Sequence, residues 1–158
     1  MSAAPAAVLL VVGLMVGTAA AAGAPTRHRG VAGTTASPPV ITEDFKPILA
    51  CNQSTTVGME GCGEHKVLAA DKLLNADVKV VFSLTSGTGR QDLVAAQTHW
   101  LAYRNSDCQS QSDVYSGGTE QPVAYVYCLA ADDSARRQDL KGFFKVLTQG
   151  LAKVPRFP

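Results

Sequence analysis

Residues 88–108 read TGRQDLVAAQTHWLAYRNSDC and contain the clearest helix signal in the sequence. Thr88 and Gln91 match a capping box, in which the hydroxyl and the amide each satisfy a free backbone N–H at the start of a helix. One stripe at helical spacing follows, made of Leu93, Ala96, Gln97, Trp100, Leu101, Arg104 and Cys108. The single tryptophan lies at the centre of the stripe, where such a residue is typically a core anchor. We therefore expect a helix that packs this stripe against its neighbours.

The flanking segments also favour helices. Residues 66–84 carry apolar side chains at helical spacing, although VKVVF at 78–82 is β-branched and is compatible with a strand. Thr119 is a candidate N-cap for a further helix. Asp132, Asp133 or Ser134 is a candidate cap for a last helix, whose inward residues are Leu140, Phe143, Phe144 and Leu147. The predicted fold class is all-α: a small disulfide-stapled bundle of four to five helices.

The four cysteines, Cys51, Cys62, Cys108 and Cys128, favour two disulfides. A zinc site is the alternative, but zinc ligands usually come in closely spaced pairs, and the sequence has no C-x-x-C and no close Cys/His cluster. Three pairings remain open. Cys51–Cys62 with Cys108–Cys128 is favoured because each bond closes a short loop beside a predicted helix.

The first residues resemble an export signal. Residues 6–16, AAVLLVVGLMV, have the length of a signal-peptide core, and small residues that suit cleavage follow them. We expect a signal peptide at 1–24, a disordered linker at 25–42, the helical domain at 43–150 and a tail at 151–158. The mature protein is then secreted or in the cell-envelope space. It has no transmembrane segment, and it is not a lipoprotein, because no cysteine precedes Cys51.

The charge is unevenly distributed along the chain. Residues 43–133 contain 12 acidic and 6 basic residues, whereas residues 134–158 contain 6 basic and 1 acidic residue. An acidic body suits a cationic partner, and a basic end suits an anionic surface such as the cell envelope. Ordinary solvated charge is the alternative explanation. Nothing in this distribution predicts binding to nucleic acid.

The central helix carries a family signature. Residues 95–108, AAQTHWLAYRNSDC, resemble the A-Q-x-x-W-x-x-Y-R-x-x-x-C motif of the LprI-type lysozyme inhibitor domain of bacterial exported proteins. Cys51 and Cys62 resemble its leading cysteine pair, and residues 116–119 with Cys128 resemble its G-G-S/T loop and final cysteine. The other matching residues are Asp71, Leu74 and Asn75, which resemble the D-x-x-L-N element, and Asp133, Arg136 and Leu140 near the end. The structural signature residues are thus Asp71, Leu74, Asn75, Gln97, Trp100, Tyr103 and Arg104.

The resemblance covers roughly residues 51–140 and implies a helical domain with two disulfides that inhibits lysozyme. The sequence departs from the family pattern at two places. Val81 or Phe82 stands where a tyrosine is usual, and Asp133 replaces a threonine, which preserves a helix cap.

Catalysis is not indicated. The sequence has no G-x-S-x-G elbow and no P-loop, and His99 has no obvious partner at helical spacing. Oxidised cysteines are not nucleophiles. We therefore expect no enzyme activity, no cofactor and no metal.

Arg104 has two interpretations, a contact surface or an internal charge-assisted hydrogen bond to an acceptor such as Asp71. The internal role is favoured because buried arginines are nearly always paired, and Asn75 is interpreted in the same way.

The predicted partner is lysozyme, by resemblance. Residues 109–121 form a polar, glycine-containing segment that could occlude the active-site cleft, with a plain surface connection as the alternative. The candidate contact residues are Asp113, Tyr115, Ser116, Gly117, Gly118 and Thr119. The second hypothesis is an envelope-associated structural or adaptor protein without inhibitory activity, and the third is an enzyme that acts on cell-wall material.

Overall fold

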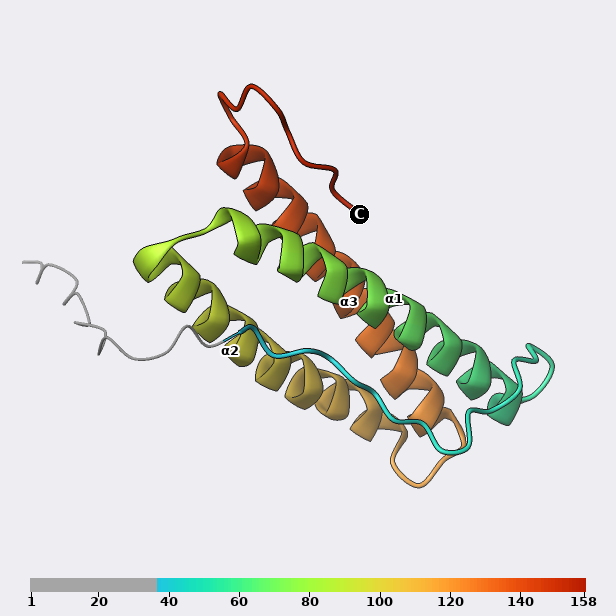
Figure 1. Ribbon diagram of the computed structural model, residues 1–158. Helices are drawn as coiled ribbons and strands as arrows, with labels where there is room; N and C mark the ends of the chain where they lie inside the picture. The colour runs from blue at the N-terminus through green and yellow to red at the C-terminus, as the bar shows by residue number, and fades with distance from the viewer. Residues whose placement is uncertain (1–36) are drawn as a thin grey trace, which may run out of the picture. The chain divides into compact units, whose positions relative to one another are not determined.

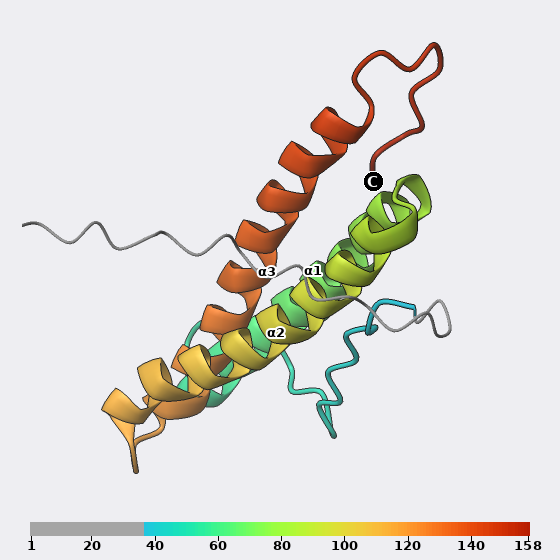
Figure 2. The same cartoon turned by 90° about the vertical axis from the view of Figure 1, so that its left-hand side faces the viewer.

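Three long helices form the part of the chain that the structure describes, residues 37–158 of a computed structural model. They are α1 (Thr56–Leu84), α2 (Gly87–Ser112) and α3 (Glu120–Leu147), with a short 3₁₀ helix, η1 (Asp113–Tyr115), between α2 and α3. Figure 1 shows α1 and α2 running in opposite directions, and α3 returning in the direction of α1. Helix α3 packs against both of the others, as the second view also shows (Figure 2). The described residues include no strand.

The all-α prediction is confirmed, but the predicted number of helices is wrong. Residues 132–134 do not start a new helix, because α3 passes through them without a break. Asp133 is fully buried and bonds an arginine of α2, so its side chain does not cap a helix. A buried acidic residue in the middle of a helix resembles a helix start when the sequence alone is read. The β-branched residues 78–82 lie in α1.

Helix α1 begins at Thr56 rather than at Lys66. Thr55 caps it, with its hydroxyl accepting a hydrogen bond from the backbone N–H of Gly58 at 3.0 Å. The glycines in the first turns hide this helix from a propensity argument, but close packing explains them. A Cβ on Gly61 would lie 2.6 Å from the carbonyl oxygen of Ala50.

Helix α2 begins one residue before the predicted cap. Ser86 occupies the N-cap position and makes no side-chain capping bond, so the expected Thr88–Gln91 box is not formed. The chain reverses between α1 and α2 in only two residues, Thr85 and Ser86. Gly87 follows with φ of 54°, a backbone conformation that favours glycine.

The chain before α1 is part of the fold. Ile41 is buried, and its backbone N–H and carbonyl both bond the Asn75 side chain at 2.9 Å. The predicted linker, residues 25–42, is therefore too long at its end, because an isoleucine that packs in the core belongs to the domain. The predicted signal peptide at 1–24 and residues 25–36 of that linker lie outside the described residues.

Two apolar clusters lie at opposite ends of the helices. One cluster, near the α1–α2 turn, consists of Ile41, Leu74, Val78, Val81, Leu93, Leu140 and Phe144. The other, near η1, consists of Val67, Cys108, Val126 and Leu129. After α3 the tail turns back, so that the ring of Phe157 lies 4.7 Å from that of Phe144 (Figure 1). None of the described helices is both long enough and apolar enough to cross a lipid bilayer.

Candidate functional site

A buried polar cluster lies between the two apolar clusters, with Arg104 of α2 at its centre. The side chain of Arg104 is almost fully buried, and three carboxylates surround it. Its Nη1 donates to Asp133 of α3 at 2.8 Å and to Asp71 of α1 at 3.2 Å, while Nη2 donates to Glu43. One guanidinium therefore connects all three helices and the chain that precedes them. The internal interpretation of Arg104 agrees with this geometry.

The cluster contains more negative than positive charge. Burial and, to a smaller extent, the neighbouring Asp133 raise the pKa of Asp71 to about 7, against the opposing effect of Arg104. Burial also raises the pKa of Asp133. One oxygen of each carboxyl group, Oδ2 of Asp71 and Oδ2 of Asp133, has no hydrogen-bond partner. A proton on Asp71 that is directed at Asp133 would satisfy both oxygens.

The other signature residues divide into internal and exposed positions. Leu74 and Gln97 are fully buried, and Gln97 accepts a hydrogen bond from Arg136 at 3.2 Å. Two guanidinium groups lie near the Trp100 ring, with the Arg104 Cζ 5.6 Å and the Arg136 Cζ 5.8 Å from the ring centroid. Tyr103, in contrast, is 59% exposed. Apart from this tyrosine, the signature describes how the interior is packed.

Two buried contacts were not found from the sequence: a second ion pair, and the contact of Glu43 with Arg104. Asp77 is fully buried and accepts a hydrogen bond from Arg137 Nε at 2.6 Å. The contact between Glu43 and Arg104 was also not anticipated. The available signal was the presence of acidic residues on otherwise apolar helix faces, since a buried carboxylate needs a partner.

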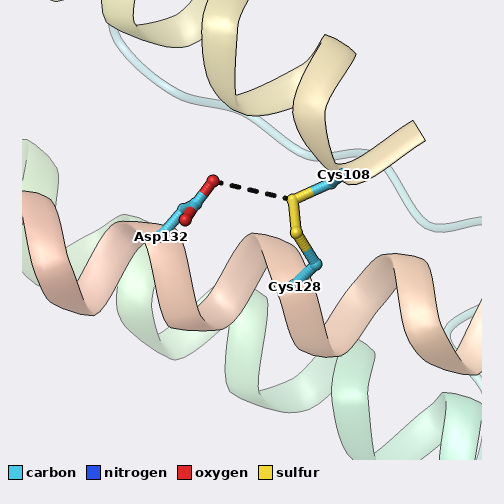
Figure 3. A group of neighbouring side chains, drawn as sticks. All are labelled: Cys108, Cys128 and Asp132. Atoms are coloured by element: carbon cyan, nitrogen blue, oxygen red, sulfur yellow. Dashed lines mark hydrogen bonds between the residues drawn. A yellow bond between two sulfur atoms is a disulfide. The ribbon is translucent and has the colours of Figure 1, made fainter. Parts of the chain in front are cut away.

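The disulfides are Cys51–Cys62 and Cys108–Cys128, which is the pairing that the sequence favours. Figure 3 shows the second bond between α2 and α3, with Asp132 directed at Cys108. The Asp132 oxygen lies 3.7 Å from the Cys108 sulfur. Since a disulfide sulfur carries no hydrogen, this contact is not a donated hydrogen bond.

These three side chains also place their ligand atoms within 4.8 Å of one another. Thiolates bind metals, whereas disulfide sulfurs do not. In the oxidised protein the group therefore offers a single carboxylate and is not a metal centre.

The predicted contact residues lie together in the connection between α2 and α3. This connection is shorter than the predicted loop, because Gln109–Ser112 belong to α2 and Glu120 and Gln121 belong to α3. Residues 113–119 remain, and all of them are exposed. They are Asp113, Val114, Tyr115, Ser116, Gly117, Gly118 and Thr119. Thr119 occupies the N-cap position of α3 but makes no side-chain capping bond.

Several bonds hold this connection in one conformation. The Asp113 carboxylate accepts hydrogen bonds from Gln109 of α2 at 2.7 Å and from Gln121 of α3 at 3.2 Å. Within the turn, Ser116 N–H donates to the Asp113 carbonyl at 3.0 Å and Gly118 N–H to the Tyr115 carbonyl at 2.9 Å. The Cys108–Cys128 disulfide ties the two helices together directly behind the turn.

Comparison with known proteins identifies one family. The family model described as lysozyme inhibitor LprI matches residues 50–140, which is more than half of the chain. Curated proteins and solved structures give no match. The matched region contains both disulfides, the Arg104, Asp71 and Asp133 side chains of the buried cluster, and the exposed connection. The chain belongs to the LprI family of lysozyme inhibitors.

Proposed function

We propose that this protein, once exported, binds a lysozyme and inhibits it by covering the active-site cleft with residues 113–119. Membership of an inhibitor family is the observation on which the proposal rests. The exposed connection between α2 and α3 supports the choice of contact surface. Its backbone bonds and the disulfide behind it fix its conformation before binding, and a fixed conformation lowers the entropy cost of association.

The charge around the connection suits a cationic lysozyme. Residues 105–135 contain five acidic residues and no lysine or arginine. Asp107, Asp113, Glu120 and Asp132 therefore give this end of the molecule a negative potential, which steers a cationic partner toward it. The residues at the turn itself, Tyr115 to Thr119, are uncharged. Uncharged residues suit a cleft lined by the two carboxylates of a glycosidase, because an acidic side chain would be repelled there.

Tyr115 is the side chain that we expect to contribute most to binding. It is half exposed at the tip of the connection, next to the 80% exposed Val114. Tyrosine is enriched among the residues that dominate interface energetics, since it buries a large ring and keeps a hydroxyl for hydrogen bonding. A tyrosine at such a position, followed by two glycines, can enter a narrow cleft without obstruction from the backbone.

The test is inhibition of purified lysozymes of several types by the wild-type protein and by Tyr115→Ser. We expect Tyr115→Ser to weaken inhibition about 30-fold, the effect of a residue that contributes about 2 kcal/mol to binding. Tyr103→Ser is the matched control, because Tyr103 is also exposed but lies on α2 outside the connection. We expect this control to retain its inhibition constant within about twofold. Equal potency of Tyr115→Ser and wild type would reject the contact surface. Failure of the wild type against every lysozyme type would reject the function.

A contact with the cell envelope is compatible with this proposal. The acidic connection precedes the first residue of α3, whereas the basic residues lie in the second half of α3 and after it. A helix of 28 residues is about 42 Å long. The two surfaces are therefore far enough apart for two partners to bind without obstructing each other.

A further inference from the structure

The last turns of α3 and the tail form a surface that the inhibitor function does not use. We call residues 140–158 the basic end. They contain four basic residues, Lys141, Lys145, Lys153 and Arg156, and no acidic residue. All four are exposed, and none of them forms a salt bridge in the described part of the chain. The positive charge of this surface is thus available to an external anion.

Large apolar side chains are exposed among these charges. Val146 is 61% exposed and Val154 52%, and Phe143 and Leu151 are exposed to a smaller degree. Phe143 and Val146 are three residues apart on α3, so they share one face of the helix. At about 100° per residue, Lys145 lies next to Val146 around the helix, whereas Lys141 lies on the side away from Phe143 and lines the hollow beside the tail. Phe143 lines the groove toward α2 together with Asp92 and Asp139. Isolated apolar residues are common on protein surfaces, but Val146, Leu151 and Val154 among lysines and arginine form a mixed surface that is typical of peripheral membrane binding.

The tail presents part of this surface in a defined way. It leaves α3, turns and comes back toward the helix, as Figure 1 shows at the red end of the chain. Phe157 anchors the returning segment by packing on Phe144. Leu151, Lys153 and Val154 therefore lie in a turn that is held at both sides, and each of them is exposed.

A polar hollow between α3 and the tail adds a place for an anionic group. Its volume is about 300 Å³, and it is lined by Ser134, Arg137, Gln138, Lys141, Phe157 and Pro158. Arg137 uses Nε to bond Asp77, and its side chain remains partly exposed. A phosphate in the hollow would face the cation of Lys141. An ammonium group donates charge-assisted hydrogen bonds to a phosphate monoanion or diester.

We infer that the basic end binds the surface of an anionic phospholipid bilayer. The lysines and Arg156 would face lipid phosphates, while Val146, Leu151 and Val154 enter the interfacial layer. An anionic polymer such as nucleic acid would use the charges but leave the apolar side chains in water. A second copy of the chain would bring two surfaces of the same charge together, which opposes association. A bilayer alone makes use of both kinds of side chain.

The experiment is co-sedimentation of the full chain with vesicles made of equal amounts of phosphatidylglycerol and phosphatidylcholine. Each basic residue near such a surface strengthens binding about fivefold. We therefore expect Lys145→Glu/Lys153→Glu to bind at least about 25-fold more weakly than the wild type, and added salt to weaken wild-type binding. We expect Val146→Ser/Leu151→Ser, which keeps every charge, to bind about tenfold more weakly.

Matched controls separate the basic end from net charge. Lys66→Glu/Lys72→Glu makes the same change in net charge on α1, where both lysines are exposed. We expect this variant to retain binding within about threefold, since charges farther than a Debye length from the membrane are screened. All variants share residues 1–36, so differences among them report on the substituted surfaces. Circular dichroism checks that each variant is folded.

Two outcomes would overturn the inference. One is unchanged sedimentation of the Lys145→Glu/Lys153→Glu variant, and the other is equal binding of the wild type to vesicles of pure phosphatidylcholine. Inhibition of lysozyme is measured on the same variants and should stay unchanged, because residues 113–119 are intact. Loss of inhibition with retained vesicle binding would count against the proposed function only.

Discussion

The two ends of the helical domain are stabilised by different means. The end near η1, which we call the stapled end, contains both disulfides, while its apolar cluster has four buried residues. The end near the α1–α2 turn, which we call the apolar end, has seven buried apolar residues and, among residues 37–158, no disulfide. The stapled end also has glycines in close contact, such as Gly63, where a Cβ would lie 2.2 Å from the Val126 side chain.

The difference shows how cross-links can replace apolar burial in a small domain. Apolar area removed from water stabilises a fold by roughly 25 cal/mol per Å², and the small residues of the stapled end provide little such area. A disulfide acts instead on the unfolded chain by restricting its conformations. The proposed inhibitory connection lies at the stapled end. A fixed backbone conformation is more important for binding there than a large apolar core.

Arg104 lies between the two ends, and its replacement should have the largest effect. Arg104→Met removes the only cation within hydrogen-bond distance of Glu43, Asp71 and Asp133 among the described residues. Removing one partner of a buried ion pair costs about 3–5 kcal/mol, because the remaining charges are left without a counter-charge. We expect the free energy of unfolding in urea, followed by Trp100 fluorescence, to fall by about that amount.

Lys72→Met is the control for this change, since Lys72 is an exposed cation on α1. Substitutions at such positions usually change stability by no more than about 0.5 kcal/mol. A small effect of Arg104→Met would mean that the two ends do not depend on the buried cluster. Hydrogen exchange would then show the ends opening independently of each other.

Removing a disulfide should have the next largest effect and should act at the stapled end. Cys108 and Cys128 are 20 residues apart, and Cys51 and Cys62 are 11 apart. The loop-entropy relation gives a loss of about 3 kcal/mol for Cys108→Ala/Cys128→Ala, and about 0.5 kcal/mol less for Cys51→Ala/Cys62→Ala. Urea unfolding measures both losses. Amide exchange should accelerate near Cys108 and Val126 and remain slow near Leu74 and Leu140.

Equal amide protection at both ends in the Cys108→Ala/Cys128→Ala variant would contradict this picture. The stapled end would then be held by its packing, and the difference between the ends would be one of composition only. Leu129→Ala in the oxidised protein provides a comparison, because it removes a fully buried side chain from the same end while keeping the disulfide.

The sequence was informative where the signal is local. The stripe from Leu93 to Cys108 is a helix, and Asp71 is a partner of Arg104, as the charge argument indicated. Both inferences need only helical spacing and the rule that a buried charge is paired. The same local signals failed at Asp133, where an acidic residue resembled a helix cap although its partner is 29 residues away.

The features that could not be predicted depend on contacts between distant segments. Glu43 reaches Arg104 across 61 residues, and the extended chain around Ile41 has no periodicity that would indicate burial. The early start of α1 was hidden by glycines, whose value lies in their contacts with residues 49–52 and Val126. For the candidate contact residues, the sequence located an exposed connection but placed its boundaries too far into α2 and α3.

The smallest expected effect is a change of stability with pH that originates in the buried Arg104 cluster, which lies between the two ends. The pKa of Asp71 is raised from 3.8 to about 7, so the folded protein keeps a proton that the unfolded chain has released by pH 5. This stabilisation is complete below about pH 4 and is lost as the pH rises through 7. The raised pKa values of Asp77, Asp132 and Asp133 act in the same direction.

For one group with this pKa, the free energy of unfolding should fall by about 1.4 kcal/mol between pH 6 and pH 8. Asp71→Asn should remove most of this dependence, because the amide can donate to Asp133 at any pH and has no proton to release. Asp44→Asn, which alters an exposed carboxylate on the chain before α1, should follow the wild-type curve. Urea unfolding at a series of pH values gives all three curves. A wild-type stability that does not fall from pH 6 to pH 8 would mean that Asp71 has already lost its proton at pH 6. Arg104 would then hold the Asp71 and Asp133 carboxylates without a proton between them, by charge pairing alone.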